Sequence, residues 1–311
     1  MFSYLNFRPY LIFKVVKMRK IRKAVITAAG FGSRFLPVVK ATPKEMLPVI
    51  DKPILQYVVE ECQQAGLEEI IIVVRQGNNV IRDYFGKDAP EMRKLLEDQG
   101  RGDRFKTVEE ILAIKNITII DQQPGLPYGN GSPVISAKEL LEGEEAFAVL
   151  FADDLILTKE KSCIQQLIEF YEQGDGDAVT GVQEVPYEEL NRYGMIKPVS
   201  GDSNSGQFQL IIEKPDPEKA PSNLASYGRF VVPFKIFDFL KADATGKDNE
   251  VWLQDANDKI AHEMKYMYKK VDGQWYTTGD PIRYFEANLH YMLADQRYSA
   301  DARKLIAGLQ V

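Results

Sequence analysis

Short apolar runs alternate with helical periodicities from residue 23 onward. Each run is nearly continuous in Val, Ile, Leu or Phe, which is typical of a strand that is buried on both faces of a parallel sheet. The runs occupy residues 23–27, 69–74, 117–121 and 146–151. We expect helices between them. The alternation therefore predicts βαβ units and an α/β fold with a largely parallel sheet.

Two helices of this first half can be placed from the pattern. Residues 54–65 follow Pro53, which suits the start of a helix, and they end at Gly66. In the second helix, apolar side chains recur at the spacing i, i+3, i+4 and i+7, which predicts a stripe facing the core. They are Ile164, Leu167, Ile168 and Tyr171. Residues 86–110 are charged and weakly periodic, and we interpret them as a helical lid or insertion.

The pattern changes at about residue 175. Three predicted strands, at residues 177–185, 194–199 and 207–214, are separated by polar turns, of which residues 200–206 are the plainest. This arrangement indicates an added, partly antiparallel segment. Helices are predicted over residues 234–241, 253–264, 281–294 and 301–309. Neither an internal repeat nor a clear linker interrupts the chain, so we expect two subregions of one compact unit.

Charge narrows the kinds of ligand. The 311 residues include 39 Lys and Arg against 45 Asp and Glu, a net charge of −6. Such a chain lacks the general basic surface that nucleic acids require, so a polyanion must be bound by a few placed cations. Small phosphorylated ligands fit this limit, and we expect no nucleic-acid partner. No run of 18 apolar residues is present, so we expect no membrane partner.

Cysteine and histidine contribute little chemistry. Cys62 and Cys163 lack the CxxC spacing of zinc or redox sites, and we expect buried thiols in a reducing cytoplasm. His262 and His290 have no spacing for a shared metal, and we interpret them as structural. Residues 1–17 lack a signal-peptide pattern and are expected to be an extension or a start-site artefact.

The first candidate site follows the strand at residues 23–27. Gly30 and Gly32 allow backbone N–H groups to approach phosphate oxygens at the end of a parallel strand. A Gly-x-Gly turn alone is a weak signal, but Arg34 and Lys44 add the two cations that a triphosphate needs as pyrophosphate leaves. Phe35 stands where a dinucleotide-binding motif requires a third glycine, which argues against a nucleotide-cofactor oxidoreductase.

Longer stretches of the sequence resemble a known family. Residues 28–37 read AAGFGSRFLP and residues 42–53 read TPKEMLPVIDKP. Together they resemble the signature of sugar-1-phosphate nucleotidyltransferases, and within that family the bacterial UDP-glucose pyrophosphorylases. Further stretches agree in order: LQYVVEE (55–61), FAVLFADDL (147–155), YGMIKP (193–198), IIEKP (211–215), APSNLASYGRFV (220–231), LQDA (253–256) and TTGDP (277–281).

The resemblance covers residues 19–295 and implies a fold. It implies a Rossmann-like nucleotidyltransferase core, with a mostly parallel mixed sheet flanked by helices and a smaller β-rich sugar-binding subregion. The nucleotide-binding part would span about 19–175 and the sugar-binding part about 176–280. Outside this domain we expect an N-terminal extension at residues 1–18 and a C-terminal helix at residues 296–311.

The resemblance also assigns catalytic roles. Arg34 and Lys44 would bind the triphosphate, and Lys214 would hold the attacking sugar phosphate. Asp153 would bind Mg²⁺, since a hard cation takes a carboxylate together with phosphate oxygens; Asp154 is the second choice. Because the nucleophile is an already ionised phosphate oxygen, no general base is needed, which agrees with the shortage of histidine.

Substrate-binding residues fall into three groups. The first loop contributes Ala29, Gly30, Gly32 and Glu45. The segment that recognises the base in relatives contributes Gln123, Gly129 and Gly131, although a Gly/Asn turn needs no ligand to explain it. The residues expected to line the sugar pocket are Gly194, Glu213, Asn223 and Gly228.

Three positions depart from the family pattern. Relatives carry Asp where this chain has Thr277, Gln where it has Trp252, and His where it has Ser132. The expected reaction joins UTP and glucose 1-phosphate to give UDP-glucose and pyrophosphate in the cytoplasm, with Mg²⁺ as cofactor and a homodimer or homotetramer as the assembly. The departures leave two alternatives open: another nucleoside triphosphate or hexose 1-phosphate, or a catalytically weakened regulatory paralogue.

Overall fold

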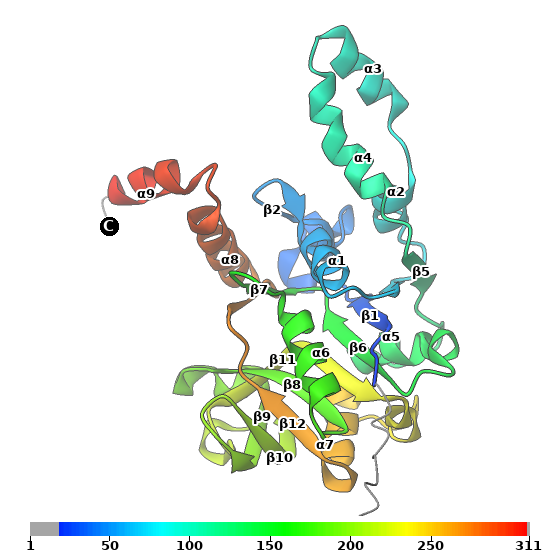
Figure 1. Cartoon of the computed structure of the whole chain (residues 1–311), viewed down its shortest axis with the longest axis vertical. Coiled ribbons are helices and arrows are strands. Elements are labelled where there is room, and N and C mark those ends of the chain that lie inside the picture. The colour runs from blue at the N-terminus through cyan, green and yellow to red at the C-terminus, as the bar shows by residue number, and fades with distance from the viewer. Residues whose placement is uncertain (1–18, 310–311) are drawn as a thin grey trace, which may run out of the picture.

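A nine-stranded mixed sheet forms the centre of the molecule (Figure 1). The computed structural model describes residues 19–309, and the proposed extension at residues 1–18 lies outside them. The strand order is β5-β4-β1-β6-β11-β8-β12-β10-β9. The strands are β1 (Lys23–Ala28), β4 (Glu69–Val74), β5 (Ile117–Asp121), β6 (Ala146–Phe151), β8 (Ala178–Glu184), β9 (Gly194–Gly201), β10 (Ser205–Glu213), β11 (Leu224–Pro233) and β12 (Tyr266–Lys269).

The four predicted strands of the first half are confirmed. Strands β5, β4, β1 and β6 lie side by side and are all parallel, with Val25 of β1 paired to Ile71 of β4 and to Val149 of β6. Alternate side chains of these strands enter two hydrophobic clusters, one on each face of the sheet. Burial on both faces explains the continuous apolar runs.

Strand β11 joins the two halves of the chain in one sheet. It runs antiparallel to β6 on one side and to β8 on the other. Strand β12 is parallel to β8, and β10 and β9 complete the sheet as an antiparallel pair. The predicted, partly antiparallel addition is therefore confirmed, and it extends the same sheet rather than forming a second one.

Helices cover both faces of the sheet. Helices α1 (Ile54–Gln64) and α6 (Cys163–Gln173) pack in one cluster, and α6 buries the predicted stripe of Ile164, Leu167, Ile168 and Tyr171. The short α5 (Gly131–Ser136) and α7 (Leu253–Glu263) pack in the other cluster. The molecule is thus an α/β layered structure, as the sequence pattern predicts.

The charged stretch near residue 100 forms a helical arm. It contains α2 (Val80–Gly86), α3 (Pro90–Asp98) and α4 (Lys106–Leu112), which together connect β4 to β5. Figure 1 shows α3 and α4 projecting away from the sheet. Phe105 is buried within the arm beneath the guanidinium of Arg93, 4.2 Å from the ring centroid. The prediction of a helical insertion is confirmed.

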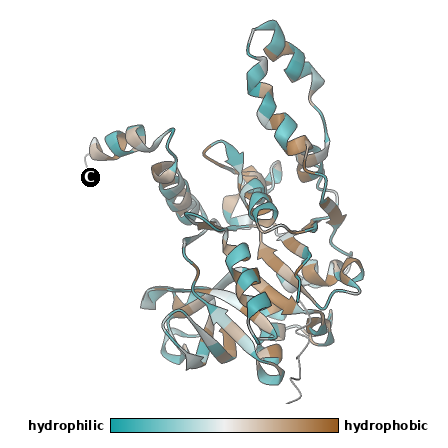
Figure 2. Ribbon diagram, in the orientation of Figure 1, coloured by the Kyte–Doolittle hydropathy of each residue, from teal (hydrophilic) through white to brown (hydrophobic). Residues whose placement is uncertain are grey.

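A second projection contains the last two helices. Helix α8 (Pro281–Ala294) begins at Asp280, whose side chain accepts a hydrogen bond from the backbone N–H of Arg283. Helix α9 (Ser299–Ala307) follows and extends away from the sheet in Figure 1. Figure 2 shows brown, hydrophobic residues on both helices. No helix within residues 19–309 is both long and apolar enough to cross a membrane.

The sequence pattern errs at several places, and it did not predict strands β11 and β12 of the main sheet. The helix predicted at 234–241 is a 3-10 turn over Phe234–Asp238. Its aromatic side chains pack into the core, where Phe237 stacks on Phe147, and this packing favours a tight turn over a regular helix. A two-stranded ribbon of β7 (Asp154–Leu157) and β13 (Gln274–Thr277) was not predicted. A smaller one joins β2 (Pro48–Val49) and β3 (Lys52–Pro53).

Candidate active site

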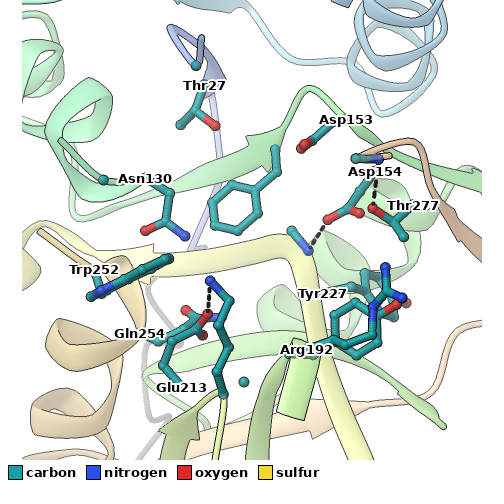
Figure 3. Close-up of a pocket in the computed structure, with 18 of the residues that line it drawn as sticks. Thr27, Asn130, Asp153, Asp154, Arg192, Glu213, Tyr227, Trp252, Gln254 and Thr277 are labelled. Atoms are coloured by element: carbon teal, nitrogen blue, oxygen red, sulfur yellow. Dashed lines mark hydrogen bonds and ion pairs between the residues drawn. The ribbon is translucent and has the colours of Figure 1, made fainter. Parts of the chain in front are cut away.

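A cavity of about 870 Å³ opens at the ends of the central strands. Its walls come from the loops after β1 and β6, from the ends of β9 and β10, and from β11. Figure 3 shows side chains from these segments pointing into one space. The carboxyl edge of parallel strands is where nucleotides bind in open α/β sheets. The location therefore agrees with the site expected from the sequence.

The loop after β1 places a lysine at the cavity wall. Gly32 adopts φ 64°, a left-handed conformation that favours glycine, and a Cβ there would lie 3.2 Å from Cβ of Lys44. Gly30 also lies against the Lys44 side chain. Both Gly30 and Lys44 line the cavity, whereas Gly32 does not. Gly32 thus supports Lys44 from behind instead of contacting a ligand.

Lys44 is paired with the expected metal ligand. Its Nζ lies 2.5 Å from Oδ2 of Asp153, and both side chains are partly buried. Burial disfavours both charged forms, but their mutual attraction outweighs it, so the pKa of Lys44 is raised and the pKa of Asp153 is lowered. Both groups are therefore charged at neutral pH. Arg34 stands nearby and donates to the carbonyl of Gly279 at 3.2 Å.

Asp154 faces a different environment from its neighbour. Its Oδ1 accepts the indole N–H of Trp275 at 2.8 Å, and its Oδ2 accepts the backbone N–H of Gly228 at 2.9 Å. Burial, together with the charge of Asp153, raises the pKa of Asp154 to about 6. Both carboxyl groups line the cavity, but both oxygens of Asp154 accept hydrogen bonds from the backbone or the indole, whereas Asp153 is paired through one oxygen with Lys44.

Glu45 is a buried carboxyl group at the cavity wall. Its side chain is almost fully buried, and Oε2 has no hydrogen-bond partner in the structure. Burial raises its pKa to about 7, although Lys44 opposes the shift. Since a buried acceptor without a partner is costly, the group is suited to meet a donor on a bound ligand.

Three segments hold the loop that carries Asp153. The backbone N–H and hydroxyl of Thr278 both donate to the Asp153 carbonyl, at 2.7 and 2.9 Å. The fully buried guanidinium of Arg229 donates to the carbonyls of Phe151 and Asp154, at 3.1 and 2.8 Å. Arg229 is itself paired with Glu61 of α1 at 2.7 Å. The loop that carries Asp153 is thus fixed from β11, α1 and the segment after β13.

The loop expected to recognise the base packs against residues 250–253. A Cβ on Gly129 would lie 2.3 Å from the carbonyl oxygen of Val251, and its φ is 131°, so only glycine fits there. Gly131 donates its N–H to the same carbonyl at 2.9 Å. The side chain of Asn130 accepts the N–H of Leu253 at 2.8 Å. Gly129 and Asn130 line the cavity, whereas Gly131 lies behind it as the first residue of α5.

The opposite wall contains the Glu-Lys pair. Glu213 ends β10 beside Gly194, which begins β9. A Cβ on Gly194 would lie 3.2 Å from Oε2 of Glu213, so the glycine leaves room for this carboxylate. Lys214 lies 3.5 Å from Oε1 of Glu213 and 4.0 Å from the centroid of the Trp252 ring. All four residues line the cavity, and Glu213 and Trp252 are labelled there in Figure 3.

Most of the predicted residues meet in this one cavity. Those that line it are Ala29, Gly30, Arg34, Lys44, Glu45, Gly129, Asp153, Gly194, Glu213, Lys214 and Gly228. Four others do not: Gly32, Gly131, Gln123 and Asn223. After β5 the residue at the wall is Gln122, while the Gln123 N–H donates to the hydroxyl of Ser136. Asn223 is exposed at the start of β11, where its carbonyl accepts from Val185.

Sequence reasoning missed several residues of the site. Trp275 was not singled out, although it lies two residues before the TTGDP stretch and its indole N–H donates to Asp154. Asn130 lay inside the Gly-Asn-Gly turn, where a turn preference explained it equally well. Glu61 and Arg229 lay inside stretches that carry the resemblance, but their pairing depends on contacts that are distant in the sequence.

The donor set fits a divalent cation that a phosphate ligand helps to bind. In the described part of the chain, no three His, Cys, Asp or Glu side chains gather closely enough to bind a metal by themselves. Asp153 supplies one carboxylate at the cavity wall, next to Lys44 and Arg34, which would attract phosphate oxygens. Mg²⁺ commonly takes one or two carboxylates together with phosphates and water. Position 277, a threonine, adds a hydroxyl near Asp153 and no charge.

A parallel sheet edge, a glycine turn with two cations and a carboxylate paired with one of them are the features expected of a nucleotide-binding transferase site. The chain belongs to the nucleotidyl transferase family, whose model matches residues 23–293. Enzymes of this family generally use a divalent metal ion.

Individual relatives and solved structures within this family are similar to the chain over nearly its whole length. The chain is 38% identical over 294 residues to UTP–glucose-1-phosphate uridylyltransferase of Staphylococcus epidermidis, covering 94% of this chain and 100% of the relative. The Staphylococcus haemolyticus enzyme is 37% identical over 94% and 99%. The UTP-bound UGPase of Acinetobacter baumannii matches with a TM-score of 0.81 at 32% identity, over 93% of this chain and all of that one. A UDP-glucose pyrophosphorylase complexed with UDP-glucose gives a TM-score of 0.76 at 32% identity, over 88% and 100%.

Proposed function

We propose that this protein is a UTP–glucose-1-phosphate uridylyltransferase that makes UDP-glucose and pyrophosphate. The observation that carries this conclusion is the single cavity in which the Lys44–Asp153 pair faces the Glu213–Lys214 pair. The first pair suits a triphosphate with a metal ion, and the second suits a phosphorylated sugar. The relatives with this printed activity cover nearly the whole chain.

The reaction needs positioning and charge rather than proton transfer. Arg34 and Lys44 would bind the triphosphate and stabilise the negative charge that develops as pyrophosphate leaves. Lys214 would hold the sugar phosphate so that its oxygen approaches the α-phosphorus in line with the leaving group. Glu213 would accept hydrogen bonds from sugar hydroxyls. The phosphate oxygen is already ionised, so none of these residues has to act as a base.

We further propose Mg²⁺ as the metal, bound by Asp153 together with phosphate oxygens. When bound there, Mg²⁺ would stabilise charge on the phosphates during transfer. Lys44 would then pair with phosphate oxygens instead of with Asp153. The reason is that the Lys44 ammonium and the metal ion would compete for the same face of the Asp153 carboxylate. Asp154 would keep its hydrogen bonds to Trp275 and Gly228.

The activity is tested by pyrophosphate release. Purified protein is mixed with Mg²⁺ and with each pairing of UTP, dTTP or CTP with glucose, galactose or N-acetylglucosamine 1-phosphate. We expect the highest kcat/KM for UTP with glucose 1-phosphate. A clear preference for another pair would replace the proposed substrates but keep the reaction class. Absence of release from all pairs, with UDP-glucose still binding, would favour the regulatory paralogue.

Self-association is proposed from the surface of the last two helices. Ile282 and Phe285 on α8 are 69% and 63% exposed, and Leu305 and Leu309 at α9 are 71% and 68% exposed. Large exposed apolar residues at both ends of this projecting segment suit contacts with another chain. We infer a homodimer or homotetramer that buries this surface. Light scattering should give a mass above one chain, and Phe285→Glu with Leu305→Glu should reduce it to the monomer.

The place of action is proposed to be the cytoplasm. Cys62 and Cys163 are both buried free thiols, as is usual for proteins of a reducing compartment. Besides copies of the same chain, the proposed partners are small molecules, namely UTP, glucose 1-phosphate, UDP-glucose and pyrophosphate. Fractionation of cells followed by immunodetection would test the location.

A further inference from the structure

An aromatic ring lies against the lysine that is expected to hold the sugar phosphate. The Nζ of Lys214 is 4.0 Å from the centroid of the Trp252 ring, and 3.5 Å from Oε1 of Glu213. Figure 3 shows Trp252 and Glu213 among the side chains of the cavity. Among aromatic side chains, tryptophan attracts a cation over its face most strongly. The ammonium therefore has two partners of different kinds, a carboxylate and a π face.

The backbone at Lys214 fixes where its side chain begins. Its φ is 46°, a left-handed conformation that is uncommon for a residue other than glycine. The N–H of Lys214 donates to the carbonyl of Tyr193 at 3.1 Å. The side chain that leaves this fixed point has four flexible carbons, so the backbone alone does not decide where the ammonium rests. Contacts at the far end have to do so.

Trp252 itself is held from the other side of the cavity. Of its two neighbours in sequence, Val251 donates its N–H to the carbonyl of Tyr128, and Leu253 donates its N–H to Oδ1 of Asn130, both at 2.8 Å. The close fit of Gly129 against Val251 fixes the same segment. The indole therefore stands on a rigid support that belongs to the loop expected to bind the base.

We propose that Trp252 is a positioning residue that places the Lys214 ammonium for the phosphate of the sugar substrate. The inference rests on the proposed function, in which Lys214 binds that phosphate. A π face attracts the ammonium without taking up a specific N–H, so these donors stay available to phosphate oxygens. The glutamine of the family pattern would instead offer a carbonyl oxygen that occupies one donor. The ring is thus this chain's own device for the sugar-phosphate subsite.

The inference makes a specific claim about affinity. Removing the ring should raise KM for glucose 1-phosphate by about 2- to 30-fold, the range expected for a cation–π contact between exposed and desolvated settings. KM for UTP should stay within about twofold, because Lys214 lies on the sugar side of the cavity. Trp252→Phe keeps a weaker π face and should fall between the wild type and Trp252→Leu.

A double-mutant cycle tests the claim. Initial rates of pyrophosphate release are measured for the wild type, Trp252→Leu, Lys214→Ala and the double variant, with each substrate varied in turn. Lys214→Ala alone should lower kcat/KM for glucose 1-phosphate roughly 10- to 200-fold, as for the loss of a charge-assisted hydrogen bond. In that background Trp252→Leu should have no further effect. The melting temperature of each variant controls for folding, and Trp252→Phe serves if the leucine variant does not fold.

The outcomes separate this inference from the proposed function. Additive effects of the two substitutions would overturn it and would show that the ring contacts the sugar directly. An equal rise in KM for both substrates would also overturn it, because Trp252 would then support the base loop. In either case an active wild type leaves the proposed function intact. A wild type that releases no pyrophosphate would instead refute the function, and the inference with it.

Discussion

Adjacent aspartates differ in role because of what each side chain contacts. Asp154 accepts a hydrogen bond on each of its oxygens, from the Trp275 indole and from the Gly228 N–H, whereas Asp153 is paired through one oxygen with Lys44. The sequence placed both at the end of a strand and ranked Asp153 first by resemblance alone. The contacts now give a physical reason for the ranking, since an oxygen that already accepts hydrogen bonds from the protein is less available to a metal.

The different contacts of Asp153 and Asp154 lead to an expectation for how the reaction rate depends on Mg²⁺. Asp153→Ala is expected to lower kcat about 10²- to 10⁴-fold, if the metal supplies several kcal/mol of transition-state stabilisation. Thr277→Asp should lower the Mg²⁺ concentration that gives half the maximal rate, because it adds a second carboxylate near the first. Rates are measured over a Mg²⁺ series at saturating substrates. An unchanged Mg²⁺ requirement in Thr277→Asp would show that this position does not act on the metal.

Glu45 should make stability depend on pH. Its pKa in the folded protein is about 7 against an ordinary value of 4.5, so the folded state binds the proton more tightly than the unfolded state does. Stability from this group is therefore present below about pH 4.5 and is lost as pH rises to about 7. The amide side chain of Glu45→Gln cannot ionise. As pH rises from about 5 to 8, the free energy of unfolding of Glu45→Gln minus that of the wild type should therefore increase by on the order of 2 kcal/mol.

Urea denaturation at a series of pH values measures this gain. The wild type at each pH is the reference for Glu45→Gln. A carboxyl group introduced elsewhere, for example by Gln56→Glu, would not serve as a control, because the Gln56 side chain makes hydrogen bonds that the substitution would change. A constant difference between Glu45→Gln and the wild type across the range would contradict the raised pKa.

At the scale of the elements, one buried ion pair connects the site to the core. Arg229 on β11 is fully buried, pairs with Glu61 on α1, and donates to two carbonyls that flank Asp153. Glu61 also accepts the N–H of Ile164 in the first turn of α6. Since breaking such a pair leaves a charge buried without compensation, this contact should be costly to lose.

Arg229→Met is expected to lower the free energy of unfolding by about 3–5 kcal/mol. Arg229→Met combined with Glu61→Leu should recover at least part of that loss, because the Glu61 carboxylate is then no longer left buried without its partner. In both variants, backbone amides of residues 152–154 should exchange with deuterium faster, since the carbonyls beside them lose their donor. If Arg229→Met alone were as stable as the wild type, the stabilising role of the Glu61–Arg229 pair would be refuted.

Local pattern predicted some elements well and others not at all. The strands at residues 23–27, 69–74, 117–121 and 146–151 are buried on both faces, so their continuous apolar runs were sufficient. The ribbon of β7 and β13 was missed because each strand has four residues, and their pairing joins segments more than a hundred residues apart. The cavity residues were found through motifs, whereas Trp275 and the Glu61–Arg229 pair depend on long-range packing that no local pattern contains.

At the scale of the whole molecule, both substrate regions belong to one sheet. Strand β11 pairs with β6 of the first half and with β8 of the second, so neither half has a complete sheet of its own. We therefore expect calorimetry to give one main unfolding transition. UDP-glucose at about one hundred times its Kd should stabilise the protein by about 2.7 kcal/mol. Two peaks, with only one shifted by ligand, would contradict this expectation.

The helical arm between β4 and β5 is a segment in which a protease could cut the chain without separating its two parts. Its outer part is stabilised mainly by its own contacts, such as Arg93 with Glu109 and with the ring of Phe105. Exposed basic residues near its tip, Arg101 and Arg104, are sites at which trypsin cleaves when local opening is easy. A cut there would leave two fragments joined by the parallel pairing of β4 with β5 and of β1 with β6, and by the core. The nicked protein would still contain every residue of the cavity in its original place.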